Sequence, residues 1–221
     1  MGKVMSSRVK IFIIVIIVIS SIYIIKKIIV DPQPVRDIKK NTVYIGGRRG
    51  VFPKSDYARY YIEFKDDNTY VLMHDDSRRK DEDYFEDGDR SCPEIEMFFG
   101  SYEIKNGNYV LTLTERTGVE FKDVKAVKNK KINFFYRNKY KDGGNMEAMV
   151  FLTRKGNYLF GYPDDTGKSY DERARYYWLY NKSDIKKLPS SPEEFRKQFK
   201  MDKKAEQERL AEQERLAKQS Q

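Results

Sequence analysis

Apolar residues follow two different patterns along this chain. From Ile11 to Ile25 the sequence carries no charged residue and consists almost entirely of Ile and Val. Between about residues 42 and 188, short aromatic and β-branched runs alternate with turn-forming Lys, Asn, Asp and Gly. The first pattern is typical of a helix that enters a bilayer, and the second of β-strands joined by tight turns.

The N-terminal apolar segment predicts a transmembrane helix over residues 11–30. At about 1.5 Å per residue, the run from Ile11 to Ile25 alone is shorter than a hydrocarbon core of about 30 Å. Continuing to residue 30 gives the required length if the ammonium groups of Lys26 and Lys27 reach the headgroups. We therefore expect these residues to form the membrane anchor.

The segment has the features of an uncleaved signal anchor. Residues 1–10 form a short basic tail, as in a signal sequence, but Ser20 and Ser21 are followed directly by further apolar residues instead of a small-residue cleavage site. The counts of Lys and Arg favour a cytoplasmic domain, whereas a long domain crosses largely regardless of flanking charge. We expect a single-pass protein of the cell membrane with its domain on the extracytoplasmic side.

The rest of the chain predicts one mainly β domain over residues 42–188. A Pro-containing linker at residues 31–41 precedes it, and a charged C-terminal α-helix over residues 191–221 follows it. We expect strands at Ala58–Phe64, Thr69–His74, Phe98–Ile104, Tyr109–Thr114, Val119–Val127, Lys131–Arg137, Ala148–Thr153, Tyr158–Tyr162 and Arg175–Tyr180.

Three predicted turns share one pattern, in FKDDNTYVL, IKNGNYVLTL and TRKGNYLFGY. Asn and Gly tolerate the positive φ of tight hairpins, so consecutive strands should form an antiparallel meander. Eight or nine such strands are enough to close into a β-barrel. The alternation predicts that Leu111 and Leu113 share one face of their strand, and that Ile132, Phe134 and Tyr136 share one face of theirs.

The stretch YIEFKDDNTYVLM, followed by FFGSYEIKNGNYVLTLT and KINFFYR, resembles the repeating core of small lipocalin-like β-barrels of the bacterial cell envelope. The likeness covers residues 60–137. The positions that carry it are Gly100, Tyr102, Ile104, Leu111, Leu113, Ile132 and Phe134. The resemblance implies a lipocalin-like fold and an envelope location, and it supplies no binding residues.

The formal charge of +9 is unevenly distributed. Residues 1–40 carry a net charge of +6, residues 41–200 carry +3, and residues 201–221 carry none. The excess therefore lies beside the predicted anchor, where it suits anionic lipid headgroups. A domain of mixed charge is a poor candidate for nucleic-acid binding, so the predicted partner is the lipid bilayer and not a nucleic acid.

Residues 74–90 form a loop with eight acidic and four basic side chains. Aligned with a calcium-binding loop, it places Asp83, Asp87 and Glu94 at ligand positions, but Phe85 then stands where a third carboxylate is needed. This is half of a motif. The alternative is a solvated, charge-mixed insertion, and we predict no cofactor.

No catalytic motif is recognisable. His74 is the only histidine and Cys92 the only cysteine, which excludes a multi-histidine zinc site and an internal disulfide. We expect a binding module for a small apolar ligand or lipid rather than an enzyme, provided that Phe and Tyr do not fill the barrel. One alternative is a structural or protein-interaction module acting through loop residues 75–90 or the C-terminal helix. The other is a hydrolase with an unrecognised carboxylate site.

The C-terminal region carries a strong helix start. Ser191 can cap the helix, with Pro192 at its first position and Glu194 completing an S-x-x-E box. We expect Phe195 and Phe199 to dock on the domain. The hexapeptide AEQERL then occurs twice, and its six-residue period argues against a sustained coiled-coil seam, so an exposed helix is predicted.

Overall fold

The computed structural model describes residues 13, 15–21, 31–88, 91–146 and 148–219, in two units, Met1–Gln33 and Pro34–Gln221. In the first unit, residues 13 and 15–21 are helical and exposed. No helix within the described ranges combines the length and apolar character needed to span a bilayer. Most of the predicted anchor, including Ile11, Ile25, Lys26 and Lys27, lies outside these ranges, so the anchor stays a prediction.

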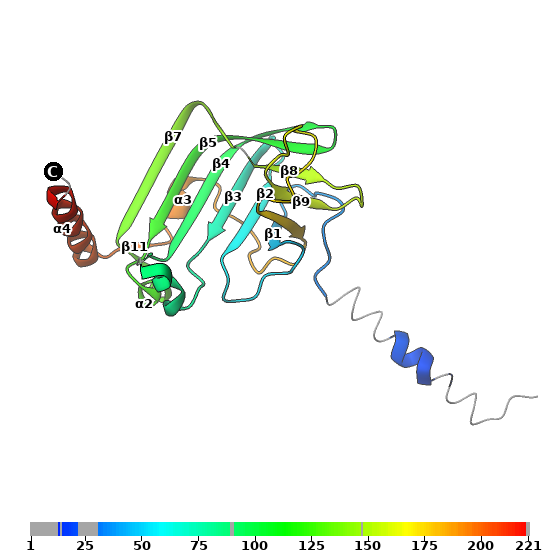
Figure 1. Cartoon of the computed structure of the whole chain (residues 1–221), viewed down its shortest axis with the longest axis horizontal. Helices are drawn as coiled ribbons and strands as arrows, with labels where there is room; N and C mark the ends of the chain where they lie inside the picture. Colours follow the sequence, from blue (N-terminus) through cyan, green and yellow to red (C-terminus); the bar gives the residue numbers. More distant parts are fainter. Residues whose placement is uncertain (1–12, 14, 22–30, 89–90, 147, 220–221) are drawn as a thin grey trace, which may run out of the picture. The chain divides into compact units, whose positions relative to one another are not determined.

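The second unit is mainly β and contains an antiparallel closed barrel (Figure 1). Eight strands close it in the order β1-β2-β3-β4-β5-β8-β9-β10, with β10 returning to β1. This meander confirms the mainly β, antiparallel barrel part of the predicted fold class. The barrel strands are β1 (Val43–Arg48), β2 (Arg59–Phe64), β3 (Thr69–Asp75), β4 (Glu94–Lys105), β5 (Asn108–Glu120), β8 (Met149–Leu152), β9 (Tyr158–Gly161) and β10 (Tyr176–Tyr180).

Strand β5 joins the closed part of the barrel to a ninth strand, β7 (Phe134–Asn145). It pairs with β4 over its whole length, with β7 between Thr112 and Glu120, and with β8 at Tyr109. Strands β7 and β8 therefore follow one another along the same edge of β5.

The predicted hairpin turns have the expected backbone. Asn68, Asn106 and Gly107 lie at φ values of 59°, 53° and 80°, and Gly156 lies at 75°. Asn and Gly adopt this left-handed conformation at low cost, which explains why the three turns share their composition.

Aromatic side chains fill the concave face of the barrel. The ring of Phe64 lies 5.0 Å from that of Tyr102 and 4.6 Å from that of Tyr109, between strands that are not neighbours. The buried members of this first core, each no more than 9% exposed, are Val35, Tyr44, Ile62, Phe64, Tyr70, Leu72, Tyr102, Tyr109, Leu111, Ala148, Val150, Phe160 and Leu179.

A second core lies on the convex face of strands β1 to β5. Residues 183–199, here called the strap, cover it with Leu188 and Phe195, both 1% exposed. The strap contains helix α3 (Pro192–Arg196), which is visible behind the sheet in Figure 1. Alternate residues of these strands thus point to opposite faces of the sheet. One set packs in the core inside the barrel, and the other packs in the core under the strap.

Several predicted strand boundaries are wrong. Strand β5 contains both the predicted strand Tyr109–Thr114 and the start of the predicted strand Val119–Val127. Residues 115–118 join the two, because they continue the pairing after a register shift beyond Leu113. The rest of Val119–Val127 forms helix α2 (Val124–Lys128), since the Asp123 carboxylate caps it by accepting from the Ala126 amide at 2.7 Å. Strand β1, rich in Gly, was not predicted.

The expected strand Lys131–Arg137 is interrupted at Asn133. Ile132 ends the short strand β6 (Lys131–Ile132) and is buried in the second core, whereas Phe134 and Tyr136 lie together on the concave side with their rings 5.9 Å apart. The prediction that Ile132 shares their face is therefore wrong. The amide of Asn133 donates to the carbonyl of Glu120 at 3.0 Å. This bond interrupts the strand, so the side chains after Asn133 no longer alternate in phase with Ile132.

The C-terminal region divides into three elements instead of the single helix predicted over residues 191–221. Helix α3 is followed by β11 (Lys200–Met201), which pairs in parallel with β6, and then by α4 (Lys203–Gln219). The docking of Phe195 and Phe199 is confirmed by their contacts in the second core. Helix α4 exposes Leu210 and Leu216, as expected for a helix without a seam.

Candidate functional site beneath the strap

A pocket of about 260 Å³ lies between the convex face of the sheet and the strap. We call it the strap pocket. Its apolar lining comes from β3, β4, the end of β5, α2 and the strap, as Met73, Ile95, Phe121, Val127, Ile185, Leu188, Phe195 and Phe199. Asp75, Lys130, Lys187 and Gln198 also line it. The site therefore combines an apolar interior with a few charged groups, as small-molecule sites do.

Three phenylalanines hold the walls of the strap pocket in place. The Phe199 ring lies edge-on to Phe121 at 5.6 Å and to Phe195 at 5.2 Å. Phe121 and Phe195 are at most 1% exposed, so they are fixed by packing on the core side. Ser191 caps α3 by accepting from the Glu194 amide at 3.2 Å, which orients Phe195 towards the sheet.

The predicted capping box at α3 is shifted by one residue. The Glu194 carboxylate accepts from the amide and hydroxyl of Ser190, at 2.7 and 2.6 Å, instead of from the amide of the cap residue Ser191. These two bonds still connect the start of the helix to Ser190, the strap residue before the cap.

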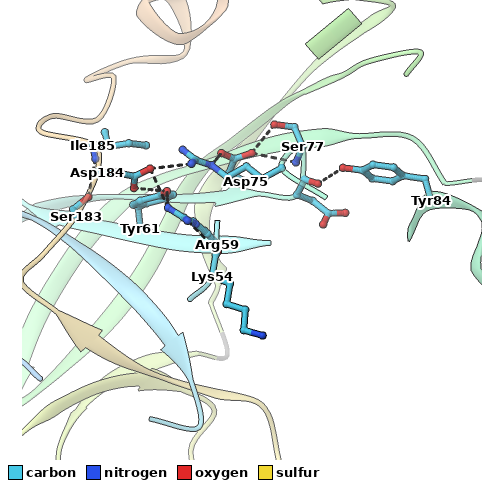
Figure 2. Close-up of polar contacts among 11 residues, drawn as sticks. Lys54, Arg59, Tyr61, Asp75, Ser77, Tyr84, Ser183, Asp184 and Ile185 are labelled. Atoms are coloured by element: carbon cyan, nitrogen blue, oxygen red, sulfur yellow. Dashed lines mark hydrogen bonds and ion pairs between the residues drawn. The ribbon is translucent and has the colours of Figure 1, made fainter. Parts of the chain in front are cut away.

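An ionic clamp fixes the strap beside the pocket, and Figure 2 shows it in close-up. We define the clamp as Arg59, Tyr61, Arg78 and Asp184. The Asp184 carboxylate accepts from the Tyr61 hydroxyl and from Nη1 of Arg78, both at 2.8 Å, and lies 3.0 Å from Nη1 of Arg59. Burial alone would raise the pKa of Asp184, but these three partners lower it, so the carboxylate is ionised at neutral pH.

Asp75 connects the clamp to the wall of the pocket. This side chain is 5% exposed, and its carboxylate accepts from the Ser77 amide and hydroxyl at 3.1 and 2.7 Å and from Nε of Arg78 at 2.7 Å. Because Asp75 also lines the pocket, the carboxylate that orients Arg78 is the same one that borders the ligand space. Ile185, next to Asp184, contributes an apolar side chain to the same wall.

The strap has a second attachment at its centre. The amide of Leu188 donates to Oε2 of Glu63 at 2.9 Å, and Nζ of Lys65 lies 2.6 Å from the other oxygen of Glu63. Glu63 is 2% exposed, so its charge is compensated within the domain. The strap is thus held to the sheet by polar contacts at Asp184 and at Leu188.

A larger and more open pocket, of about 690 Å³, lies near the β2–β3 turn. Its lining includes Asp66 and Asp67, whose carboxylates accept from Asn41 Nδ2 at 2.5 Å and from the Thr69 hydroxyl at 2.6 Å. These two carboxylates are therefore already bonded to neighbouring side chains. We favour the smaller strap pocket because its walls are mainly apolar and are built from several elements.

The concave face carries a row of polar and aromatic side chains that crosses five strands. Tyr60, His74, Glu96, Gly118 and Tyr136 are successive cross-strand neighbours on β2, β3, β4, β5 and β7. The rings of Tyr60 and His74 stack at 4.4 Å. A Cβ atom at Gly118 would lie 2.5 Å from the hydroxyl of Tyr136, so the glycine allows the tyrosine to lie across β5.

Glu96 is the centre of this row. Its Oε1 accepts from Nε of Arg116 at 2.9 Å and from the Tyr136 hydroxyl at 2.7 Å, and Nδ1 of His74 lies 3.5 Å from its Oε2. Burial would raise the pKa of Glu96, but these hydrogen bonds lower it to about 2. The sequence did not reveal this group, since His74 and Glu96 lie on different strands and meet only through the register of β3 and β4.

The residues of the predicted calcium loop have separate partners. Asp83 Oδ2 accepts from the Lys80 amide at 3.1 Å, whereas Glu94 Oε1 lies 2.7 Å from the Tyr136 hydroxyl on the concave face, whose single proton it shares with Glu96. The side chain of Asp87 lies outside what the structure describes. Within the described side chains, no group of three or more His, Cys, Asp or Glu residues is arranged to hold a metal.

No protein-family model matches the chain, and no curated protein is similar to it. Carboxylates do gather on the concave face, but Glu96 is occupied by three donors, and the expectation that the chain is not an enzyme stays a prediction.

Proposed function

We propose that the domain is a binding module that holds a small, mainly apolar ligand with an acidic head group in the strap pocket. The observation that carries this proposal is the apolar lining of the pocket beside two lysines, Lys130 and Lys187. The predicted location inside the barrel is less favourable, since the rings of the first core fill that space. We therefore place the ligand on the opposite face of the sheet.

The size and chemistry of the pocket support a short acyl chain. A volume of about 260 Å³ is close to the lower end of the roughly 300–1,000 Å³ typical of small-molecule sites. Burying an apolar chain there is favoured by about 25 cal/mol for each Å² removed from water. The ammonium groups of Lys130 and Lys187 in the lining can pair with a carboxylate. A medium-chain fatty acid such as decanoic acid therefore suits both the apolar and the basic parts of the lining.

We also propose that residues 11–30 anchor this module in the cell membrane, with the domain on the extracytoplasmic side. The sequence pattern supports this location, because the apolar run and the flanking lysines match a membrane-inserting segment. Proximity to a bilayer would supply acyl chains at high local concentration. Alkaline carbonate extraction of membranes tests the anchor separately, since a protein released intact into the supernatant is not inserted.

Calorimetric titration of the full-length chain, purified in a neutral detergent, with decanoate tests the ligand. We expect saturable binding that Val127→Trp abolishes, because the indole occupies the pocket. The matched control is Val124→Trp, which places the same side chain on the same helix at a position that does not line the pocket.

A second pair of variants tests the acidic head. Lys187→Gln should weaken the binding of decanoate about tenfold, which corresponds to about 1.4 kcal/mol, whereas Lys186→Gln should leave it unchanged. The proposal fails if Val127→Trp and Val124→Trp bind decanoate equally well, or if decanol binds as tightly as decanoate.

A further inference from the structure

Two arginines on the concave face lack a carboxylate partner. Arg48 ends β1 and Arg175 directly precedes β10, and both side chains are exposed. Within the described residues, no carboxylate lies within ion-pair distance of either guanidinium. By contrast, an acidic partner is within that distance for Arg59, Arg78, Arg79, Arg116, Arg137 and Arg173.

Strand register brings these two arginines to the same place. Arg48 is the cross-strand partner of Tyr177 on β10. Arg175 precedes Tyr177 by two residues, so it lies on the same face of the strand. Both guanidinium groups act on the Tyr177 hydroxyl: burial raises the pKa of Tyr177, and Arg175 and Arg48 oppose that increase. The two positive charges thus flank one tyrosine.

A rigid layer of rings lies next to the arginines. The ring of Tyr60 lies 4.5 Å from that of Tyr177 and 5.8 Å from that of Phe160. Gly46 separates Tyr60 from Tyr177 in the sheet, and a Cβ atom there would lie only 3.2 and 3.1 Å from their Cβ atoms. The glycine therefore lets the two tyrosines approach closely, and packing fixes their hydroxyl groups.

Hydrogen-bond donors dominate this part of the face. Burial raises the pKa of Tyr60, and the nearby Tyr162 adds to the effect, so the Tyr60 hydroxyl stays protonated at neutral pH. Tyr162 is 45% exposed and can reach a bound molecule. The carboxylate of Glu96, farther along the row, is already bound by Arg116 and Tyr136. Because no carboxylate in the described part of the chain forms an ion pair with Arg48 or Arg175, the local charge is positive.

We propose that Arg48, Arg175 and the hydroxyls of Tyr60, Tyr162 and Tyr177, here called the arginine–tyrosine site, bind the phosphate group of a soluble phosphate monoester. A phosphate monoester carries a charge of about −1.5 to −2 at pH 7, which two guanidinium groups can balance. Guanidinium groups bind phosphate oxygens in a bidentate geometry, and tyrosine hydroxyls can donate to the remaining oxygens. A carboxylate, with one charge, leaves one arginine uncompensated.

This site is independent of the strap pocket. It lies on the concave face of the sheet, formed by β1, β2, β9 and β10, whereas the strap covers the convex face. Failure of one proposal therefore leaves the other intact.

Titration calorimetry of the full-length chain in neutral detergent at low salt, with glycerol 3-phosphate as the probe, tests the site. The test variant is Arg48→Gln combined with Arg175→Gln. We expect it to weaken binding at least about tenfold, equal to about 1.4 kcal/mol. Because both side chains are exposed and unpaired, the urea midpoint of the variant should equal that of the original chain, so a loss of binding will not reflect unfolding.

The matched controls separate a site from general attraction. Arg173→Gln removes an exposed arginine that precedes β10 but pairs with Asp171, and it should leave the affinity unchanged. Glycerate, whose single carboxylate carries one charge, should bind more weakly than glycerol 3-phosphate. The proposal is overturned if Arg173→Gln weakens binding as much as replacing Arg48 and Arg175, if glycerate binds as tightly as the phosphate, or if vesicles bearing phosphatidylglycerol bind and glycerol 3-phosphate does not.

Discussion

Replacing Glu96 by Gln should destabilise the protein in a pH-dependent manner. Hydrogen bonds from His74, Tyr136 and Arg116 outweigh the effect of burial and lower the pKa of Glu96 from 4.5 to about 2. The Glu96 side chain is only 12% exposed, so solvent screens these contacts little. A shift of this size corresponds to at most about 3 kcal/mol of folding free energy at neutral pH.

The sign follows from linkage. The pKa of Glu96 is lower in the folded protein than in the unfolded chain, so its contribution is complete above about pH 4.5 and is lost as the pH falls to about 2. The variant Glu96→Gln lacks this contribution at every pH. The difference in unfolding free energy between the two proteins should therefore approach 3 kcal/mol at pH 7 and shrink steadily between pH 4.5 and pH 2.

Urea unfolding followed by the fluorescence of Trp178, the single tryptophan, measures this difference. The control is Glu103→Gln on the same strand, whose side chain is 62% exposed and forms a surface ion pair with Lys105. Its effect should stay within about 0.5 kcal/mol at all pH values. A Glu96→Gln difference that is equally large at pH 7 and pH 2 would falsify the assignment of this stability to the ionised carboxylate.

Three further substitutions test the strap and the concave row in the same urea assay. Asp184→Asn should cost about 2 kcal/mol, because Arg59, only 8% exposed, loses its carboxylate; an unchanged midpoint would show that the clamp does not stabilise the strap. Gly118→Ala should cost about 1–3 kcal/mol, since the new methyl group displaces Tyr136, and retention of full stability would contradict that contact. Phe195→Ala should cost about 3–5 kcal/mol through the cavity left in the second core, and a loss below 1 kcal/mol would mean that the strap packs loosely.

Local patterns were sufficient to predict most of the barrel. Alternating residues and Asn- or Gly-containing turns fix the strand directions, and Leu111 and Leu113 lie on one face as expected. The same patterns failed where a local cap or a backbone irregularity decides the outcome. Asp123 turns a β-like run into α2, and the hydrogen bond of Asn133 moves Ile132 into the other core. Such effects depend on single contacts that periodicity does not reveal.

The candidate sites could not be found from spacing in the sequence. The clamp joins Arg59 of β2 to Asp184 of the strap, and the strap pocket needs Phe121 and Phe195 from opposite sides. These residues meet only after the strap folds over the sheet. The one available signal was the helix start at Ser191 with the following phenylalanines, which correctly predicted that this segment docks on the domain.

Strand β7 has one further consequence, for how this domain meets other molecules. Along the described chain it hydrogen-bonds to β5 on one side, which leaves the backbone groups of its other side able to accept a strand from elsewhere. Lys139 and Lys141 are exposed at alternate positions along it, and Arg137 is tied to Glu193 in α3. Positive charges on an edge strand repel an identical incoming edge. The edge of β7 can thus stay unpaired even when copies of the protein are crowded together, because its lysines oppose the edge-to-edge association that builds fibrils.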